Sequence, residues 1–280
     1  MSALLLSLTQ DIYRLLVWAI GLGLLFLPLE HFFARRPGKV LRPGIGIDVA
    51  YYFINGILPK WLVLLPMAVV AAGIHRLVPA GFHAWVADWP TGLRFAAMVV
   101  VGDIGAYWGH RMMHQVPSLW RFHAVHHSAT QIDWMVNSKA HPVDMVLVRL
   151  CGLVPIHVLG LAQTSTGQLG PLMLAYLMLG TTWSFFVHAN LRWRFGWLEQ
   201  VVATPAFHHW HHTNDSPAVI DKNYAAIFPW IDRLFGTLYL PKDRFPERYG
   251  TNTEVGSTLA TQLVRPFTPA ERPAQTTPAR

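Results

Sequence analysis

Long apolar stretches alternate with short polar connections through most of the chain. A helix crosses the hydrocarbon core of a bilayer with about 20 residues, a length that residues 13–33 and 49–74 reach and that residues 93–110 nearly reach. Residues 143–188 hold two further apolar blocks, and the break between them at residues 160–170 predicts a helical hairpin. The pattern therefore predicts an all-α fold: a polytopic membrane protein with four to five membrane helices.

The second apolar stretch and the segment after it are less regular. Pro59 and Lys60 interrupt the stretch, which fits either a bent helix or a hairpin that dips into the bilayer. Residues 75–90 are mixed in polarity, so we expect a short connection at the membrane interface.

The rest of the chain is more polar. From residue 191 onward only residues 227–240 are apolar, and that piece is too short to span a membrane. We expect residues 1–264 to form one integral-membrane domain, with a core at about residues 93–240 and a cytosolic helical cap. Residues 265–280 contain four prolines and few apolar side chains, so we expect a disordered C-terminal tail.

The composition agrees with a membrane-embedded chain. Apolar residues make up 52% and charged residues only 13%, with a mean hydropathy of +0.31. The net charge is +7, but the basic residues flank apolar segments, so an anionic lipid leaflet is the expected partner and no nucleic acid is. Cys151 is the only cysteine, which excludes an intrachain disulfide and a thiolate metal site.

The first polar connection is rich in basic residues, namely Arg35, Arg36, Lys39 and Arg42. Because basic loops stay on the cytoplasmic side, this connection is predicted to be cytoplasmic. Counting the predicted spans from there places the cap on the same face. We expect a multi-pass protein of a bacterial inner membrane, whose first stretch is a retained helix because it lacks the basic start of a signal peptide.

Histidine is concentrated in the middle of the chain, where 12 of the 15 histidines lie between residues 110 and 212. Three clusters have helical spacing: His110 and His114; His123, His126 and His127; His208, His211 and His212. Residues at i, i+3 and i+4 share one face of a helix, so their rings reach the same ion. His209 falls between these positions and is predicted to face away.

Neutral imidazole binds first-row transition metals well, and the clusters hold enough rings for two ions. Each triplet can give two rings to one ion and the third to a neighbouring ion. Two single histidines beside loop residues, His141 and His188, complete the set. The ten candidate ligands are His110, His114, His123, His126, His127, His141, His188, His208, His211 and His212.

Metal-bound histidines need acceptors for their second ring N–H, and four side chains near the clusters are candidates for supporting the ligands. They are Asp103, Tyr107, Asn137 and Asn223. Asp103 lies two helical turns before His110, on the same face. Tyr107 fits either donation to a bound oxygen species or an anchor at the membrane interface. Asp133 and Asp144 are interpreted as helix caps or turn residues.

Six short motifs follow one another between residues 103 and 237. They are Asp103 to His114, Trp120 to Ser128, Lys139 to Pro142, His188 to Asn190, Thr204 to His212, and Asn223 to Thr237. In this order they resemble the fatty acid hydroxylase / sterol desaturase superfamily. The resemblance implies a helical membrane enzyme with two histidine-bound Fe ions and O2 as co-substrate. It also implies hydroxylation or desaturation of a C–H bond in a sterol, a fatty acyl chain or a related lipid, with no catalytic residue assigned beyond the ligands.

The chain contains neither the cysteines of a ferredoxin nor a heme-binding extension. We therefore expect a separate electron donor of the ferredoxin or cytochrome b5 type, with its reductase. The pattern leaves three alternatives open. They are a bis-histidine heme electron carrier, a membrane metal-binding or transport protein and, less favoured without a carboxylate base between the histidines, a zinc hydrolase.

Overall fold

The computed structural model describes residues 3–163 and 170–268. Regular structure in these residues is helical, and the pairing between extended segments is limited to isolated bridges, Ala34 with Leu191 and Thr213 with Tyr249. The all-α prediction is confirmed.

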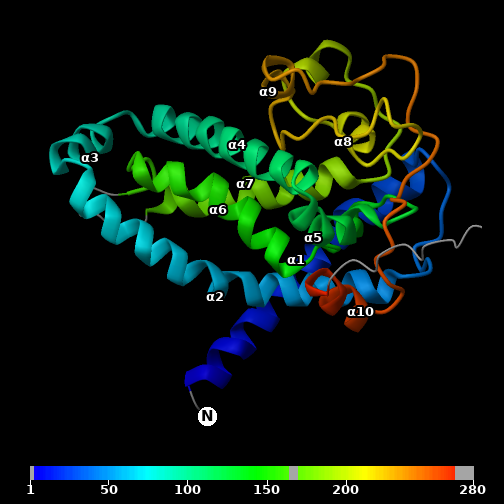
Figure 1. Cartoon of the computed structure of the whole chain (residues 1–280), viewed down its shortest axis with the longest axis horizontal. Helices are drawn as coiled ribbons and strands as arrows, with labels where there is room; N and C mark the ends of the chain where they lie inside the picture. The colour runs from blue at the N-terminus through cyan, green and yellow to red at the C-terminus, as the bar shows by residue number, and fades with distance from the viewer. Residues whose placement is uncertain (1–2, 164–169, 269–280) are drawn as a thin grey trace, which may run out of the picture.

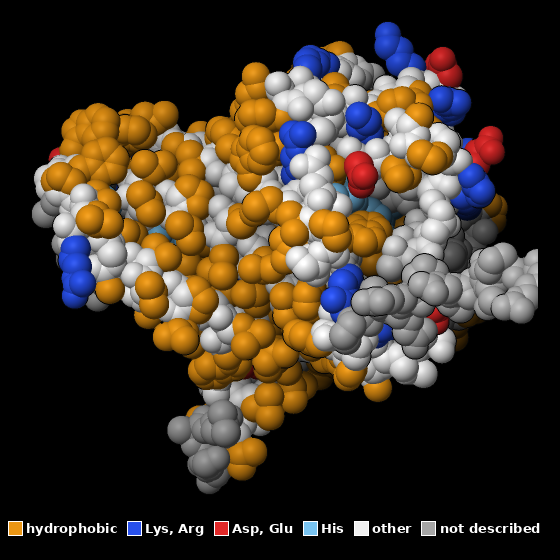
Figure 2. Space-filling model, viewed as in Figure 1, with side chains coloured by type: hydrophobic (Ala, Val, Ile, Leu, Met, Phe, Trp, Pro, Cys, Tyr) orange, Lys and Arg blue, Asp and Glu red, His pale blue; other side chains and the backbone are white. Residues whose placement is uncertain are grey.

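Two long helices carry most of the exposed apolar surface. They are α1 (Ala3–Phe33) and α2 (Ile45–Leu77), and α1 projects from the body of the molecule at its N-terminal end (Figure 1). The windows Leu5–Phe33 and Ile45–Ile74 have a mean hydropathy of 2.0, yet only 17% of each is buried. Apolar side chains cover the part of the molecule that contains these two helices, whereas charged side chains gather over the cap (Figure 2). Such surfaces indicate a membrane protein.

The α2 helix continues without a break through the predicted interruption. Pro59 and Lys60 lie inside it, and Lys60 pairs with Asp11 of α1. The chain therefore does not form a hairpin here. The mixed segment that follows contains the short helix α3 (Ala80–Ala87).

Three further helices correspond to the other predicted apolar segments. The third stretch lies within α4 (Thr91–Gln115), and the predicted hairpin consists of α6 (Pro142–Val158) and α7 (Pro171–His188). Two helices, α1 and α2, satisfy the length and hydropathy expected of a span among the described residues. The total of four to five spans stays a prediction.

Glycine lets α4 approach α6 closely. A Cβ on Gly105 would lie 2.9 Å from the carbonyl carbon of Cys151, and a Cβ on Gly109 would lie 2.8 Å from the Cβ of Cys151. Small residues bring membrane helices into this kind of backbone contact. The result is a tight α4–α6 pair, with α2 along the other side of α6 (Figure 1).

Most of the cap lies over the C-terminal ends of α4 and α7, whereas α10 (Leu259–Val264) lies beside the start of α2 (Figure 1). Several of its helices begin with proline, which has no backbone N–H. The N–H groups of a first turn have no acceptor within the helix, so proline fits that position. The elements of the cap are α5 (Pro117–His127), η1 (Trp134–Ser138), η2 (Gly196–Gln200), α8 (Pro205–His211), α9 (Pro229–Leu234), α10 and η3 (Arg265–Phe267).

The predicted tail begins with packed residues. Phe267 of η3 stacks edge-on against Phe122 and His141, with ring centroids 5.1 and 5.6 Å away. Residues 265–267 therefore belong to the folded cap, and residues 269–280 of the predicted tail lie outside the described residues.

Buried charges tie the first two helices to the cap. Arg42 pairs with Asp48 at 2.6 Å and with Asp133, whose carboxylate also caps η1. Glu30 accepts hydrogen bonds from the backbone of Trp134 and Asn190, each at 2.8 Å. The interpretation of Asp133 as a cap is thus confirmed, and η1 is held between α1 and α2.

Candidate metal centre

Nine of the ten predicted ligands converge in two groups. Group A contains His110, His114, His123, His127 and His211. Group B contains His126, His188, His208 and His212. Within each group the potential ligand atoms lie within 4.8 Å of one another. Both triplets divide as their helical spacing predicts, giving two rings to one group and one ring to the other.

The rings are oriented by hydrogen bonds at Nδ1. In four rings the Nδ1–H donates to a backbone carbonyl: His110 to Tyr224 at 2.8 Å, His126 to Lys139 at 2.9 Å, His188 to Ser184 at 2.7 Å and His211 to Lys222 at 2.9 Å. A carbonyl only accepts, so the proton of each neutral ring is at Nδ1 and the lone pair is at Nε2. These backbone contacts point Nε2 toward the other rings.

Two carboxylates orient further rings in group A. Asp144 accepts from Nδ1 of His123 at 2.9 Å, and Asp221 accepts from Nδ1 of His114 at 2.9 Å. Carboxylate–histidine pairs of this kind raise the basicity of a metal ligand. The interpretation of Asp144 as a cap or turn residue therefore misses its main contact. One signal was available, because Asp144 is the only acidic residue in the apolar segment 143–188.

Several Nε2 atoms face each other with no proton between them. The Nε2 atoms of His110 and His123 are 3.1 Å apart, and those of His126 and His188 are 3.2 Å apart. All four Nδ1 atoms donate elsewhere, so each pair brings two lone pairs together unless a cation lies between them. A metal–nitrogen distance of about 2.0–2.1 Å separates neighbouring ligands by roughly 3 Å. The donor set thus fits metal ions.

Burial disfavours the charged form of several of these rings. Desolvation lowers the pKa of His126 to about 3 and holds the pKa values of His127 and His211 well below their ordinary range. Neutral rings are the form that binds metal, so the site is prepared for a cation without first losing protons.

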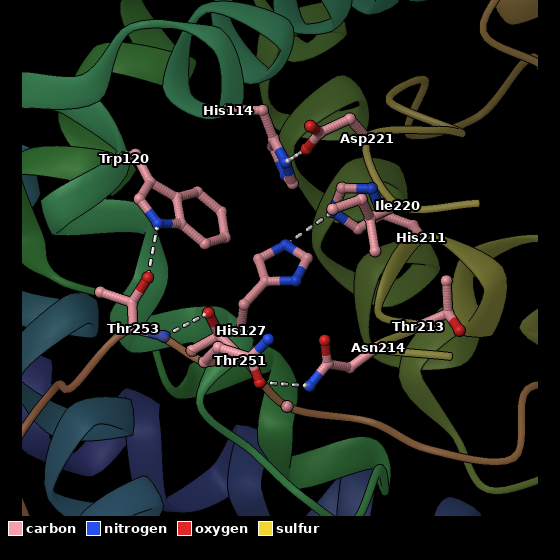
Figure 3. A pocket seen from close by; sticks show the side chains of 12 residues that line it. His114, Trp120, His127, His211, Thr213, Asn214, Ile220, Asp221, Thr251 and Thr253 are labelled. Carbon is pink, nitrogen blue, oxygen red and sulfur yellow. Dashed lines mark hydrogen bonds and ion pairs between the residues drawn. The ribbon is translucent and has the colours of Figure 1, made fainter. Parts of the chain in front are cut away.

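A cavity of about 310 Å³ borders group A. His114, His127 and His211 form part of its wall, and polar side chains from the loops after α8 and before α10 form much of the rest (Figure 3). The indole of Trp120 donates to Thr253 at 2.9 Å on one side. Group A is therefore reachable from outside the protein.

His141 does not join either group. Its Nδ1 accepts from the backbone N–H of Val143 at 3.1 Å, which caps α6, and its Nε2 donates to Leu263 at 3.1 Å. Both ring nitrogens are engaged away from the metal groups. His209 faces away as predicted, bonded to Tyr249 at 2.9 Å and to Ala189 at 3.1 Å.

The four predicted supporting residues lie one step further from the rings. Asp103 accepts from the backbone of residues 226–228, and Asn223 donates to Phe207 and Tyr239. They hold the loop that presents the carbonyl of Tyr224 to His110.

Tyr107 and Asn137 each bond to another side chain, and neither of these side chains is a histidine. The Tyr107 hydroxyl lies 2.9 Å from Thr237 in a fully buried position. Asn137 accepts from the hydroxyl of Ser184, whose carbonyl receives the His188 proton. Sequence spacing placed all four residues near the histidine clusters but did not predict their hydrogen-bond partners.

Residues 95–237 match the fatty acid hydroxylase family. The chain belongs to this family. The matched residues include all nine histidines of groups A and B.

Curated relatives oxidise lipids. The chain is 28% identical to ornithine lipid hydroxylase OlsE of Rhizobium tropici, over 91% of this chain and 74% of that protein. It is 29% identical to an alkylglycerol monooxygenase of Danio rerio, over 84% of this chain and 49% of that protein. It is also 25% identical to a Δ7-sterol 5(6)-desaturase of Gibberella zeae, over 64% of this chain and 52% of that protein. No solved structure matches the chain.

Proposed function

We propose that this protein is a membrane-bound monooxygenase that hydroxylates a C–H bond of a membrane lipid at two histidine-bound iron ions. In this reaction one atom of O2 enters the C–H bond and the other leaves as water, with two electrons and two protons from a separate donor system. Desaturation by the same site, in which two hydrogens leave the lipid, is the close alternative.

The arrangement of the nine Nε2 donors carries this proposal. Group A offers five imidazole rings and group B offers four. Structural zinc sites are four-coordinate and catalytic zinc sites use three protein ligands, so five rings around one ion favour a metal with a larger coordination number. Imidazole suits iron, and the relatives of this chain are lipid hydroxylases, monooxygenases and desaturases.

Bound iron would supply the reduction of O2 and the attack on the C–H bond. The chain's own residues hold and shield it. Asp144 and Asp221 accept the ring protons of His123 and His114, which fixes the direction of both ligands. The rings of group B and most of those of group A are buried, which limits access of bulk water to a reactive oxygen species.

The apolar helices support a lipid substrate. Apolar surface covers α1 and α2, and the histidines of both groups come from the C-terminal ends of α4 and α7 and from the cap helices α5 and α8. We infer a multi-pass protein of a bacterial inner membrane, in which α4 and the α6–α7 pair add to the two long helices. Its cap faces the cytoplasm, where a ferredoxin or cytochrome b5 type donor delivers electrons.

The rival functions fit the geometry less well. A bis-histidine heme needs two rings on opposite sides of a flat macrocycle, whereas Nε2 atoms here approach within 3.0–3.2 Å of each other. A metal carrier would bind iron but would not consume O2 in a lipid-dependent manner.

One ligand from each group provides the test. We expect His126→Ala and His211→Ala each to lower the bound iron and to abolish oxidation of the lipid. His31→Ala is the matched control, because His31 is exposed on α1 and belongs to neither group. Iron is measured by elemental analysis, and the lipids of an expressing host are screened by mass spectrometry for one added oxygen or two lost hydrogens. Variants that keep two irons and full turnover would refute the proposal.

A further inference from the structure

Polar residues are the majority among those that line the cavity beside group A. Besides the three histidines, they are Thr213, Asn214, Asp221, Thr251, Asn252 and Thr253, and Trp120, Ile220 and Gly250 complete the wall. The labelled side chains surround one common space (Figure 3). The hydroxyl, amide and carboxylate groups among them can form hydrogen bonds with a ligand, which is how a few placed polar groups fix a ligand's orientation.

The charged groups of the cavity wall favour one class of ligand. No lysine or arginine is among the described residues that line the cavity, whereas phosphate is usually bound through such cations. Asp221 uses one carboxylate oxygen for His114, and its side chain is 53% exposed. The second oxygen makes no hydrogen bond within the described residues. The wall therefore favours a ligand that donates O–H or N–H groups.

The size of the cavity limits what it holds. Its volume of about 310 Å³ lies at the lower end of the range of roughly 300–1,000 Å³ found for small-molecule sites. This space suits a small polar headgroup. Histidine atoms are visible from outside where apolar side chains meet the charged cap, so a tail can stay against the apolar surface (Figure 2).

We propose that this cavity binds the headgroup of the lipid substrate, and that the headgroup is free of phosphate and rich in O–H or N–H donors. The inference rests on the proposed function and extends it. The bonds of the lipid nearest the headgroup then lie beside His114, His127 and His211. Oxidation falls on the headgroup or on the carbons next to it, and not far along the acyl chain.

Binding can be tested without turnover. The iron-loaded full chain in phosphatidylcholine nanodiscs is dialysed against three radiolabelled probes with the same tail: dodecylglycerol, dodecylammonium and dodecyl phosphate. Binding to empty nanodiscs is subtracted. We expect saturable binding of the hydroxyl and ammonium probes, and at least tenfold weaker binding of the phosphate probe. Equal or tighter binding of the phosphate probe would overturn the inference.

Two loop variants connect the binding to the cavity. Thr251→Val and Asn252→Leu each remove hydrogen-bonding groups from the wall, and each should weaken binding of the favoured probe roughly three- to tenfold. Thr251 is partly exposed and Asn252 is exposed, so the fold should tolerate both changes. Thr9→Val removes a hydroxyl from an exposed turn of α1 and should leave binding unchanged. Unaltered binding in both loop variants would refute the assignment.

The position of the introduced oxygen separates this inference from the proposed function. Tandem mass spectrometry of the oxidised lipid should place the mass change on the headgroup fragment or the carbons attached to it. A lipid oxidised far along its tail would leave the monooxygenase intact and overturn the headgroup site. Headgroup-selective binding in a protein without lipid-dependent O2 consumption would refute the monooxygenase and leave the cavity assignment standing.

Discussion

Adding one methyl group between α4 and α6 should disturb both the fold and the metal centre. In Gly105→Ala the new Cβ would lie 2.9 Å from the carbonyl carbon of Cys151 and 3.1 Å from the Cα of Gly152. Carbon atoms prefer separations of about 3.5–4.0 Å, so the two helices must move apart by roughly 1 Å. Both obstacles are backbone atoms, so no side chain can rotate away to make room.

Overpacking of this kind typically costs about 1–3 kcal/mol, and a backbone obstacle places the expected cost near 3 kcal/mol. The same displacement separates His110 on α4 from Asp144 on α6, which orients His123. Because His110 and His123 approach within 3.1 Å, a shift of roughly 1 Å should loosen a ligand pair of group A. We expect Gly105→Ala to unfold several degrees below the wild type and to retain less iron.

Thermal unfolding in detergent and iron analysis of the purified protein measure the two effects. Gly92→Ala is the matched control, because it lies on the same helix and its added Cβ would meet nothing within 4 Å. Alanine favours helix by up to about 1 kcal/mol over glycine, so the control should be as stable as the wild type or slightly more stable. A Gly105→Ala protein with unchanged unfolding temperature and iron content would refute the close-packing argument.

Three further outcomes are expected. Asp144→Asn should weaken iron retention against a competing chelator by about 10- to 100-fold, because the carboxylate that orients His123 loses its charge, whereas the exposed Asp243→Asn should not. His141→Ala should keep both irons and lose about 1 kcal/mol of stability with the cap of α6; loss of one iron would instead make His141 a ligand. Removing iron from the wild type with a chelator should lower its unfolding temperature, because a bound metal stabilises only the folded state; equal unfolding temperatures would argue against two structured metal sites.

The spacing of residues along one helix predicted which side chains of that helix lie on the same face. The i, i+3 and i+4 positions of His123, His126 and His127 fix which rings share a face, and the structure divides them two and one as expected. His141 shows the limit of this reasoning, because it precedes Pro142 at the start of a helix. There the ring nitrogen satisfies a backbone N–H instead of a metal.

The spacing did not predict the hydrogen-bond partners that lie far away in the sequence. Asp103 lies on the same face of α4 as His110, as predicted, but its carboxylate reaches backbone N–H groups of residues 226–228. Asp144 follows a proline in the first turn of α6, where an acidic residue is ordinarily a helix-terminus residue, yet it bonds to His123 from 21 positions earlier. In both cases the chain between the partners has to fold before the contact exists.

The helices α1 and α2 and the connection between them help to position the candidate metal centre. Asp133 forms an ion pair with Arg42 and caps η1, which ends next to Lys139. The carbonyl of Lys139 accepts the Nδ1 proton of His126, so this ion pair fixes the position of a group B ligand through a few residues of backbone. Glu30 binds the backbone of Asn190 in the same way, two residues after His188. Group B therefore depends on contacts from outside the cap, because Glu30 lies in α1 and Arg42 lies in the connection to α2, where it also pairs with Asp48.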